Sequence, residues 1–158
     1  NLNADGKMAV DWNKCYGCGR CLDVCPTKAI AADDHDAALF LNYKIAEYTK
    51  AVVDGRPHFH ISLVRDVSPY CDCHAENDIP IVPDVGMFAS FDPVALDLAC
   101  ADAVNAQTAN PGSKLAAANR PDLDNLTAPF PHTSWRAQIE HAKKIGLGED
   151  CYELVNIG

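Results

Sequence analysis

Four cysteines near the start of the chain have a spacing that suits a metal cluster. Cys15, Cys18, Cys21 and Cys25 lie three, three and four residues apart, and Pro26 follows the last of them. This is the Cys-x2-Cys-x2-Cys-x3-Cys-Pro run that holds [4Fe–4S] clusters. A disulfide knot or a zinc site fits less well, because zinc sites usually separate their two ligand pairs by about a dozen residues or more. The run therefore predicts a 4Fe-4S cluster as the cofactor.

The fourth ligand of such a cluster has two candidate sources. In two-cluster ferredoxins the last cysteine of each run binds the other cluster, but this chain has no second copy of the run. Cys25 can bend back to the same cluster, which closes the smallest loop and is the solution we favour. Alternatively the first three cysteines recruit a distant thiol, and Cys71 or Cys73 in "CDCH" is the obvious donor.

The segment around Cys71 and Cys73 is a second candidate site. His74 stands beside these two cysteines, and the acidic residues of the same segment are Asp72, Glu76 and Asp78. Loops that a sheet positions often carry function. The segment is therefore a second metal position, a ligand donor to the cluster, or an ordinary polar loop.

Other residues that could do chemistry have simpler structural interpretations. His58 and His60 could join Cys71 or Cys73 at a mononuclear zinc or iron site, but two histidines on the outer face of a strand are more often solvated. The remaining expectations are Asp92 and Pro93 as the start of a helix, Asp97 on the exposed side of that helix, Cys100 and Cys151 as small buried side chains, and His141 as a surface histidine without a partner.

Composition indicates which classes of partner and which cellular location the protein can have. The 13 Lys and Arg against 22 Asp and Glu give a net charge of −9, which repels a phosphate backbone and argues against nucleic acid as a partner. No run approaches the roughly 20 apolar residues of a membrane span, and no signal peptide opens the chain. We therefore expect a cytoplasmic protein without a membrane contact, in which eight cysteines serve metal ligation rather than disulfides.

Helices and strands alternate along the rest of the chain. Apolar residues recur every three or four positions from Asp36 to Asp54, at Ala38, Leu41, Ile45, Tyr48 and Val52, which predicts an amphipathic helix. From His58 to Val64, alternation predicts a half-buried strand with Phe59, Ile61 and Leu63 on the core side and the histidines outside. Further expected elements are a strand over 81–90, a helix from Asp92 to Ala106, a long loop over 108–133, a helix from Ser134 to Ile145 and a final strand over 151–157.

This order of elements predicts the α/β class, with a mixed or parallel sheet, flanking helices and a half-ferredoxin-type cluster loop near the N-terminus. We expect a cluster segment over 1–34 and an α/β domain over 35–158. The chain starts with Asn1 rather than Met and runs at once into "KMAVDW", so we expect it to be a fragment of a longer protein.

Three stretches together resemble a known family. They are "CYGCGRCLDVCPTKAI", "SPYCDCHAENDIPIVPDVGMFASFDPVALD" and "WRAQIEHAKKIGLG". These stretches are similar to the C-terminal half of the uncharacterised iron–sulfur-centre proteins of domain-of-unknown-function family 362, and the resemblance covers nearly the whole chain. It implies iron–sulfur binding, a missing N-terminal half and no established reaction.

The sequence thus supports three functional hypotheses. The first is an electron-transfer module that passes one electron to a redox protein partner. The second is the cluster-bearing half of a redox enzyme whose substrate part lies in the missing N-terminal half, and the third is a protein with a structural cluster. No Gly-rich phosphate loop, nucleophile elbow or paired-carboxylate motif is visible, so the sequence predicts neither a reaction nor an oligomeric state.

Overall fold

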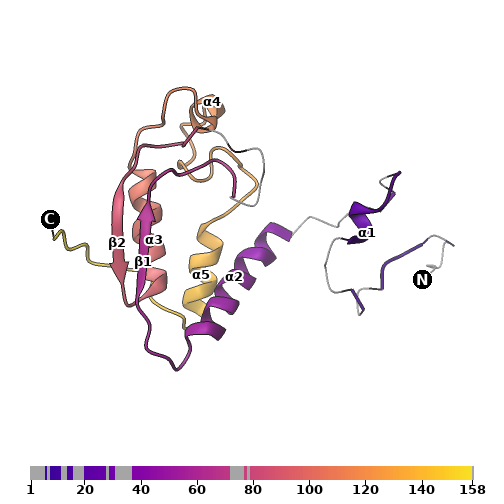
Figure 1. Cartoon of the computed structure of the whole chain (residues 1–158), viewed down its shortest axis with the longest axis horizontal. Helices are drawn as coiled ribbons and strands as arrows, with labels where there is room; N and C mark the ends of the chain where they lie inside the picture. Colours follow the sequence, from indigo (N-terminus) through magenta and orange to yellow (C-terminus); the bar gives the residue numbers. More distant parts are fainter. Residues whose placement is uncertain are drawn as a thin grey trace. The chain divides into compact units, whose positions relative to one another are not determined.

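The computed structural model divides the chain into two compact units, unit 1 (Asn1–His35) and unit 2 (Asp36–Gly158) (Figure 1). The structure describes residues 6, 8–11, 14–15, 20–27, 29–30, 37–71, 77 and 79–157. No helix among these residues is long and apolar enough to cross a membrane.

The α/β class predicted from the sequence is confirmed. The elements are α1 (Arg20–Asp23) in unit 1, and α2 (Ala37–Val53), β1 (His60–Val64), β2 (Gly86–Ser90), α3 (Pro93–Asn105), α4 (Lys114–Ala118) and α5 (Arg136–Lys144) in unit 2. The two strands pair antiparallel, with His60 opposite Ser90 and Val64 opposite Gly86. The predicted final strand over 151–157 is wrong, because these residues form no strand and are exposed. The predicted cluster loop is described only in part, at residues 15 and 20–27.

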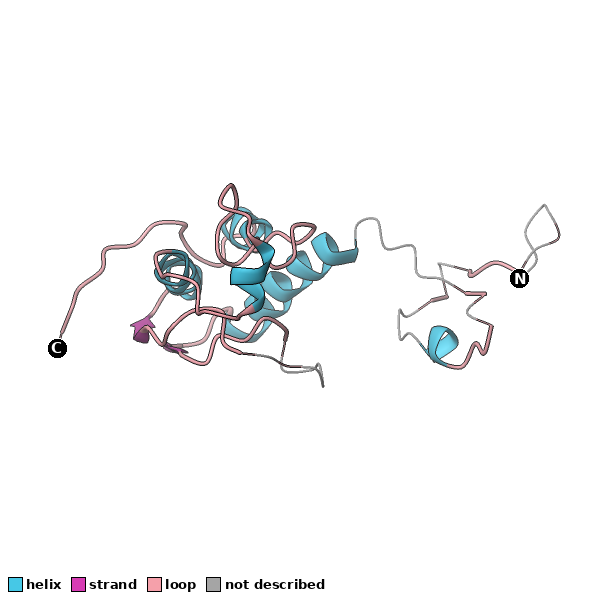
Figure 2. Ribbon diagram, turned by 90° about the horizontal axis from the view of Figure 1, so that it is seen from above, coloured by secondary structure: helices cyan, strands magenta, loops and turns pink. Residues whose placement is uncertain are grey.

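Unit 2 is built in layers from the sheet to α2. α3 packs on both strands and also contacts α5, and α5 in turn packs against α2. Figure 1 shows α3 behind the two strands, with α5 and α2 to their right, and Figure 2 shows both strands on one side of the unit with the helices on the other. One face of the sheet is therefore covered by α3.

The start of α3 follows from two residues that the sequence singled out. The Asp92 carboxylate accepts hydrogen bonds from the backbone N–H groups of Val94 and Ala95 at 2.8 and 3.0 Å, and Pro93 occupies the first helical position. Both features stabilise a helix N-terminus, since the cap satisfies orphan donors and proline has no N–H to leave unpaired. The predicted helix start is confirmed.

The orientation predicted for β1 is wrong. Phe59, Ile61 and Leu63 are 54, 59 and 65% exposed, whereas the alternate residues face α3 and are partly or fully buried. The reason is the period of two along a strand. Val64 is buried in the core, so the residues that share its side, His60 and Ser62, must face inward as well.

The helix α2 forms as predicted, but its apolar stripe does not face the core. Leu41, Ile45, Tyr48 and Val52 are exposed, and the helix buries Ala46 against α5 instead. A small residue lets two helices approach closely, which explains why Ala46 is the residue of α2 that is buried where α2 packs on α5.

The helix α5 ends as predicted but begins differently. Gly146 has a φ of +70°, and the backbone N–H groups of Gly146 and Leu147 donate to the carbonyls of Lys143 and Ala142. This is a Schellman ending, which requires a left-handed residue after the helix. The predicted cap at Ser134 is wrong, because Trp135 is the N-cap residue and makes no side-chain capping bond.

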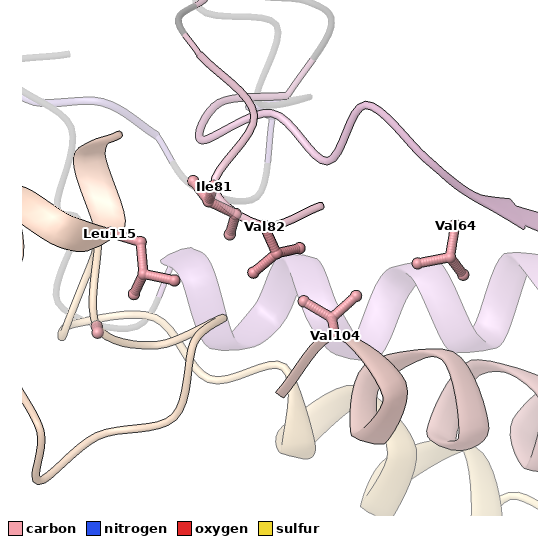
Figure 3. Close-up of a cluster of buried hydrophobic side chains, with 6 residues drawn as sticks. Val64, Ile81, Val82, Val104 and Leu115 are labelled. Carbon is pink, nitrogen blue, oxygen red and sulfur yellow. The ribbon is translucent and has the colours of Figure 1, made fainter. Parts of the chain in front are cut away.

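Two clusters of buried side chains hold unit 2 together. The first joins β1, the segment before β2, α3, α4 and the loop after it, through Val64, Ile81, Val82, Val104, Leu115 and Ala128 (Figure 3). The second joins α2, α3 and α5 through Ala46, Val94, Ile139 and Ala142. α4 lies inside the predicted long loop over 108–133, where the buried Ser113 caps it by accepting from the backbone N–H of Ala116.

Candidate metal centre

The predicted cluster ligands belong to unit 1. Cys21 lies in the short helix α1, and a hydrogen bond from the Cys25 backbone N–H to the carbonyl of Leu22 continues the turn at 3.3 Å. Cys15 and Cys21 are exposed and Cys25 is half-buried. Cys18 lies outside the described residues, so three of the four predicted ligands are in view.

The surroundings of the Cys25 sulfur favour a thiolate. Its Sγ accepts a hydrogen bond from the backbone N–H of Ala29 at 3.2 Å and lies 3.7 Å from the Thr27 hydroxyl. Hydrogen bonds lower the pKa of the Cys25 thiol from its ordinary value, first from the Thr27 side chain and then from the backbone N–H groups of Ile30 and Ala29. Thr27 was not singled out in the sequence, although a hydroxyl two residues after the last cysteine is a visible signal.

Hydrogen-bond donors of this kind also surround the ligand sulfurs of iron–sulfur clusters. Cluster ligands are thiolates, and hydrogen bonds to their sulfurs are part of how the protein tunes a cluster. Cys21 and Cys25 are free thiols. Within the described part of the chain, no group of three or more His, Cys, Asp or Glu side chains is arranged to hold a metal ion.

The second candidate segment, in unit 2, follows Tyr70, whose side chain contacts Lys114. The Lys114 ammonium donates to the Tyr70 hydroxyl at 3.0 Å and lies 4.5 Å from the centre of the Phe130 ring. Cys71, which follows Tyr70, is exposed. Cys73, His74 and the acidic residues Asp72, Glu76 and Asp78 lie outside the described residues, so their predicted role as ligands stays a prediction.

The two histidines just before and at the start of β1 are half-buried and bonded to each other, whereas the sequence predicted solvated side chains. His58 Nδ1 and His60 Nε2 are 2.8 Å apart and share a hydrogen bond, and both side chains are half-buried. The structure brings no third ligand to this pair among the residues it describes, and Cys73, one of the two cysteines that could have joined the pair, lies outside them. His60 lies on the face of the sheet that packs against α3.

Two groups on α3, Asp97 near His60 and Cys100 near Ser62, have shifted pKa values. Burial raises the pKa of Asp97, while the nearby charge of His60 opposes the shift, although part of the Asp97 side chain stays exposed as predicted. Burial also raises the pKa of the Cys100 thiol, which packs against the first core cluster. Cys100 therefore is the small, partly buried side chain that the sequence predicted.

Two further expectations about single residues are wrong. Cys151 is exposed rather than buried, because no strand forms around it. His141 has partners: its Nε2 lies 3.1 Å from a carboxylate oxygen of Glu47, and its ring stacks on Tyr43 at 4.4 Å between centroids. Both partners belong to α2, and the spacing of residues along α5 gives no information about contacts with another helix.

Known proteins resemble this chain in its first two thirds and in one short stretch. A heterodisulfide reductase-like protein from Archaeoglobus profundus is 41% identical over 51 residues, which is 28% of this chain and 7% of that protein. The chain thus spans only a small part of that relative's length. No solved structure matches the chain. Residues 13–102, more than half of the chain and including the cysteine run, match the family "Domain of unknown function (DUF362)", and the chain therefore belongs to this family.

Proposed function

We propose that the chain binds a [4Fe–4S] cluster through Cys15, Cys18, Cys21 and Cys25 and serves as an electron-transfer module. The observation that carries the proposal is the cysteine run itself, in which the half-buried thiol of Cys25 already accepts a backbone N–H at 3.2 Å. When bound, the cluster would take up and release one electron, at a potential within the range of about −700 to +450 mV that iron–sulfur clusters span.

The residues around the thiols would adapt the site to this role. The Ala29 N–H donates to the Cys25 sulfur, and such bonds offset negative charge on a ligating thiolate. Cys15 and Cys21 are exposed, which would keep the path to a partner short. The net charge of −9 would steer the protein to a redox protein with a basic docking face and away from nucleic acid. A cytoplasmic location suits these ligands, because thiols are kept reduced there.

A second candidate is the cluster-bearing part of a redox enzyme. The reductase-like name of the Archaeoglobus relative supports it, as does the exposed Cys71 at the start of a polar segment. The substrate part would then lie in another portion of the protein. Turnover that requires that portion as well as this chain would support this candidate over a simple carrier.

Anaerobic reconstitution with iron and sulfide tests the cofactor. We expect broad absorbance near about 400 nm, about four irons per chain and an EPR signal after reduction. Cys18→Ser should lose the cluster, whereas Cys151→Ser, which changes an exposed cysteine of unit 2, should keep it. A colourless protein with one zinc, or equal iron loss in both variants, would refute the assignment.

Electron transfer is tested separately with cytochrome c, a basic acceptor protein. We expect the reduced, reconstituted protein to reduce cytochrome c at a rate that falls as salt increases, because screening weakens the attraction between opposite charges. A cluster that forms but cannot be reduced, or that passes no electron to the acceptor, would instead indicate a structural role.

A further inference from the structure

One face of the two-stranded sheet carries only apolar side chains. We call it the outer sheet face, and its residues are Phe59, Ile61, Leu63, Met87, Ala89 and Phe91. Register places Ile61 opposite Ala89 and Leu63 opposite Met87. The rings of Phe59 and Phe91 extend the face at one end, with centroids 5.0 Å apart.

The outer sheet face is exposed within unit 2. Its most exposed side chains, Met87 and Phe91, expose 67 and 75% of their surface, and even Phe59 exposes 54%. The described elements of unit 2 pack elsewhere, because α3 covers the opposite face of the sheet and α5 and α2 lie beyond α3. Scattered apolar residues on a surface are ordinary, but a continuous patch of this kind marks an interaction site.

The size of the face sets the strength of any association. Aromatic side chains bury roughly 150–250 Å² each, and on this scale five large side chains that are exposed by half to three quarters offer at most about 500–800 Å². A standard interface buries roughly 800 Å² on each partner, and weak, transient ones bury less. Two such faces in contact would bury at most about 1,000–1,600 Å² in total, which is enough for a reversible dimer and too little for a permanent one.

Shape and charge favour a second copy of the chain as the occupant. A sheet face packs on another sheet about 10 Å away with the strands within roughly 30° of each other, and identical faces satisfy this by a twofold axis. No charged side chain stands on the outer sheet face, so like charges do not meet at the centre. The net charge of −9 acts from elsewhere on the molecule and is screened over about 8 Å in physiological salt.

We propose that two copies of the chain associate through the outer sheet face, forming a small sandwich of two two-stranded sheets. The association would also cover the face of the two-stranded sheet that α3 leaves open. It does not require a bound cluster.

Analytical ultracentrifugation over about 10–500 µM tests the association, a range that covers weak protein pairs. We expect the weight-average mass to rise from 17.1 kDa towards twice that value. Leu63→Lys should raise the half-association concentration at least tenfold. Val52→Lys is the matched control, because it adds the same charge at a side chain of α2 with 63% exposure against 65% for Leu63, and it should change nothing.

Three results would overturn the proposal. The first is a wild-type chain that stays monomeric over the whole range, which would assign the face to a different protein partner. The second is equal weakening by Leu63→Lys and Val52→Lys, and the third is a dimer that neither variant affects. Leu63→Thr, which keeps a strand-favouring residue, covers the case in which the charged variant fails to fold, and circular dichroism checks folding in each.

A direct contact measurement locates the interface. In a mixture of methyl-labelled and unlabelled chains, the Met87 methyl should show intermolecular contacts to the rings of Phe59 or Phe91. A dimer without these contacts would place the interface elsewhere and contradict the proposal.

Discussion

Asp92 connects two distant parts of unit 2 through one carboxylate. Its Oδ1 caps α3, and its Oδ2 accepts from the backbone N–H of Glu149, in the segment after α5, at 2.8 Å. Gly148 sits so close that a Cβ added there would overlap the Asp92 carboxylate. The sequence suggested the cap, but the link to Glu149 depends on how α5 returns to α3 and has no local signal.

We expect Asp92→Ala to lower the free energy of unfolding by about 2 kcal/mol, because it removes a helix cap and a further hydrogen bond. Gly148→Ala should also destabilise the wild type, since the carboxylate must move. In the Asp92→Ala background the same change should cost much less, because the obstructing group is gone. Urea unfolding of the four proteins gives the coupling, and additive effects would contradict the contact.

Asp124 gives a pH dependence with a definite sign. Burial alone would raise the pKa of its carboxyl, but hydrogen bonds from the Thr127 side chain and backbone and from the Trp135 indole lower it overall. A group with a lower pKa in the folded state stabilises the fold above its unfolded pKa of about 3.9 and loses this contribution as the pH falls through the folded value.

We therefore expect the thermal stability of the wild type to fall more steeply below about pH 4 than that of Asp124→Asn. The emission of Trp135, whose indole N–H donates to Asp124, should report the transition. Parallel curves for the two proteins between about pH 7 and pH 3 would show that this carboxyl does not contribute to acid sensitivity.

At the scale of elements, the side of β1 that packs in the core is not the side that carries most of its apolar residues. Val64 lies in the first core cluster, whereas Leu63 is exposed. We expect Val64→Ala to cost about 2 kcal/mol because it opens a cavity in the core. Leu63→Ala should cost less than about 0.5 kcal/mol at low protein concentration, where the chain is monomeric. Comparable losses in the two variants would contradict the observed orientation.

Element boundaries were predictable because their signals are local, whereas element orientation was not. Asp92, Pro93 and Gly146 act through their own backbone and mark the ends of α3 and α5. The direction in which a strand or helix faces depends on what packs on it. In α2 and β1 the core contact is made through small or isolated residues such as Ala46 and Val64, and the larger apolar residues point away. A hydrophobic pattern alone therefore predicted the wrong side.

At the scale of the whole molecule, the sequence predicts a set of ligands but no geometry for the candidate site. The spacing of the cysteine run is a local property, so the run alone is enough to propose a cofactor, and the four ligands stay a prediction. The fourth ligand is a question of tertiary structure, because Cys25 belongs to unit 1 and Cys71 to unit 2. The Thr27 hydroxyl lies near the Cys25 sulfur because of how the chain turns after Cys25.

Two variants distinguish the sources of the fourth ligand. If Cys25 closes the cluster, changing Cys71 and Cys73 together to Ser should leave the iron content and the reduced EPR signal intact, while Cys25→Ser should lose iron. If a distant thiol is used, the double change should give a [3Fe–4S] signal or no cluster, and Cys25→Ser should be tolerated. Equal loss of iron in the double variant and in Cys25→Ser would exclude both schemes and would indicate a second metal position shared by Cys25 and Cys71 or Cys73.

The base of the segment that carries Cys71 is fastened through backbone groups. The Ile81 N–H donates to the carbonyl of Val67 at 2.8 Å, and the carbonyl of Pro80 accepts from the Asn110 side chain at 2.8 Å. The buried Ile81 and Val82 follow immediately, and no described side chain of residues 71–79 belongs to the core cluster that they join. The chain on both sides of this segment is therefore fixed by groups that lie outside it, at Val67 before it and at Pro80 and Ile81 after it.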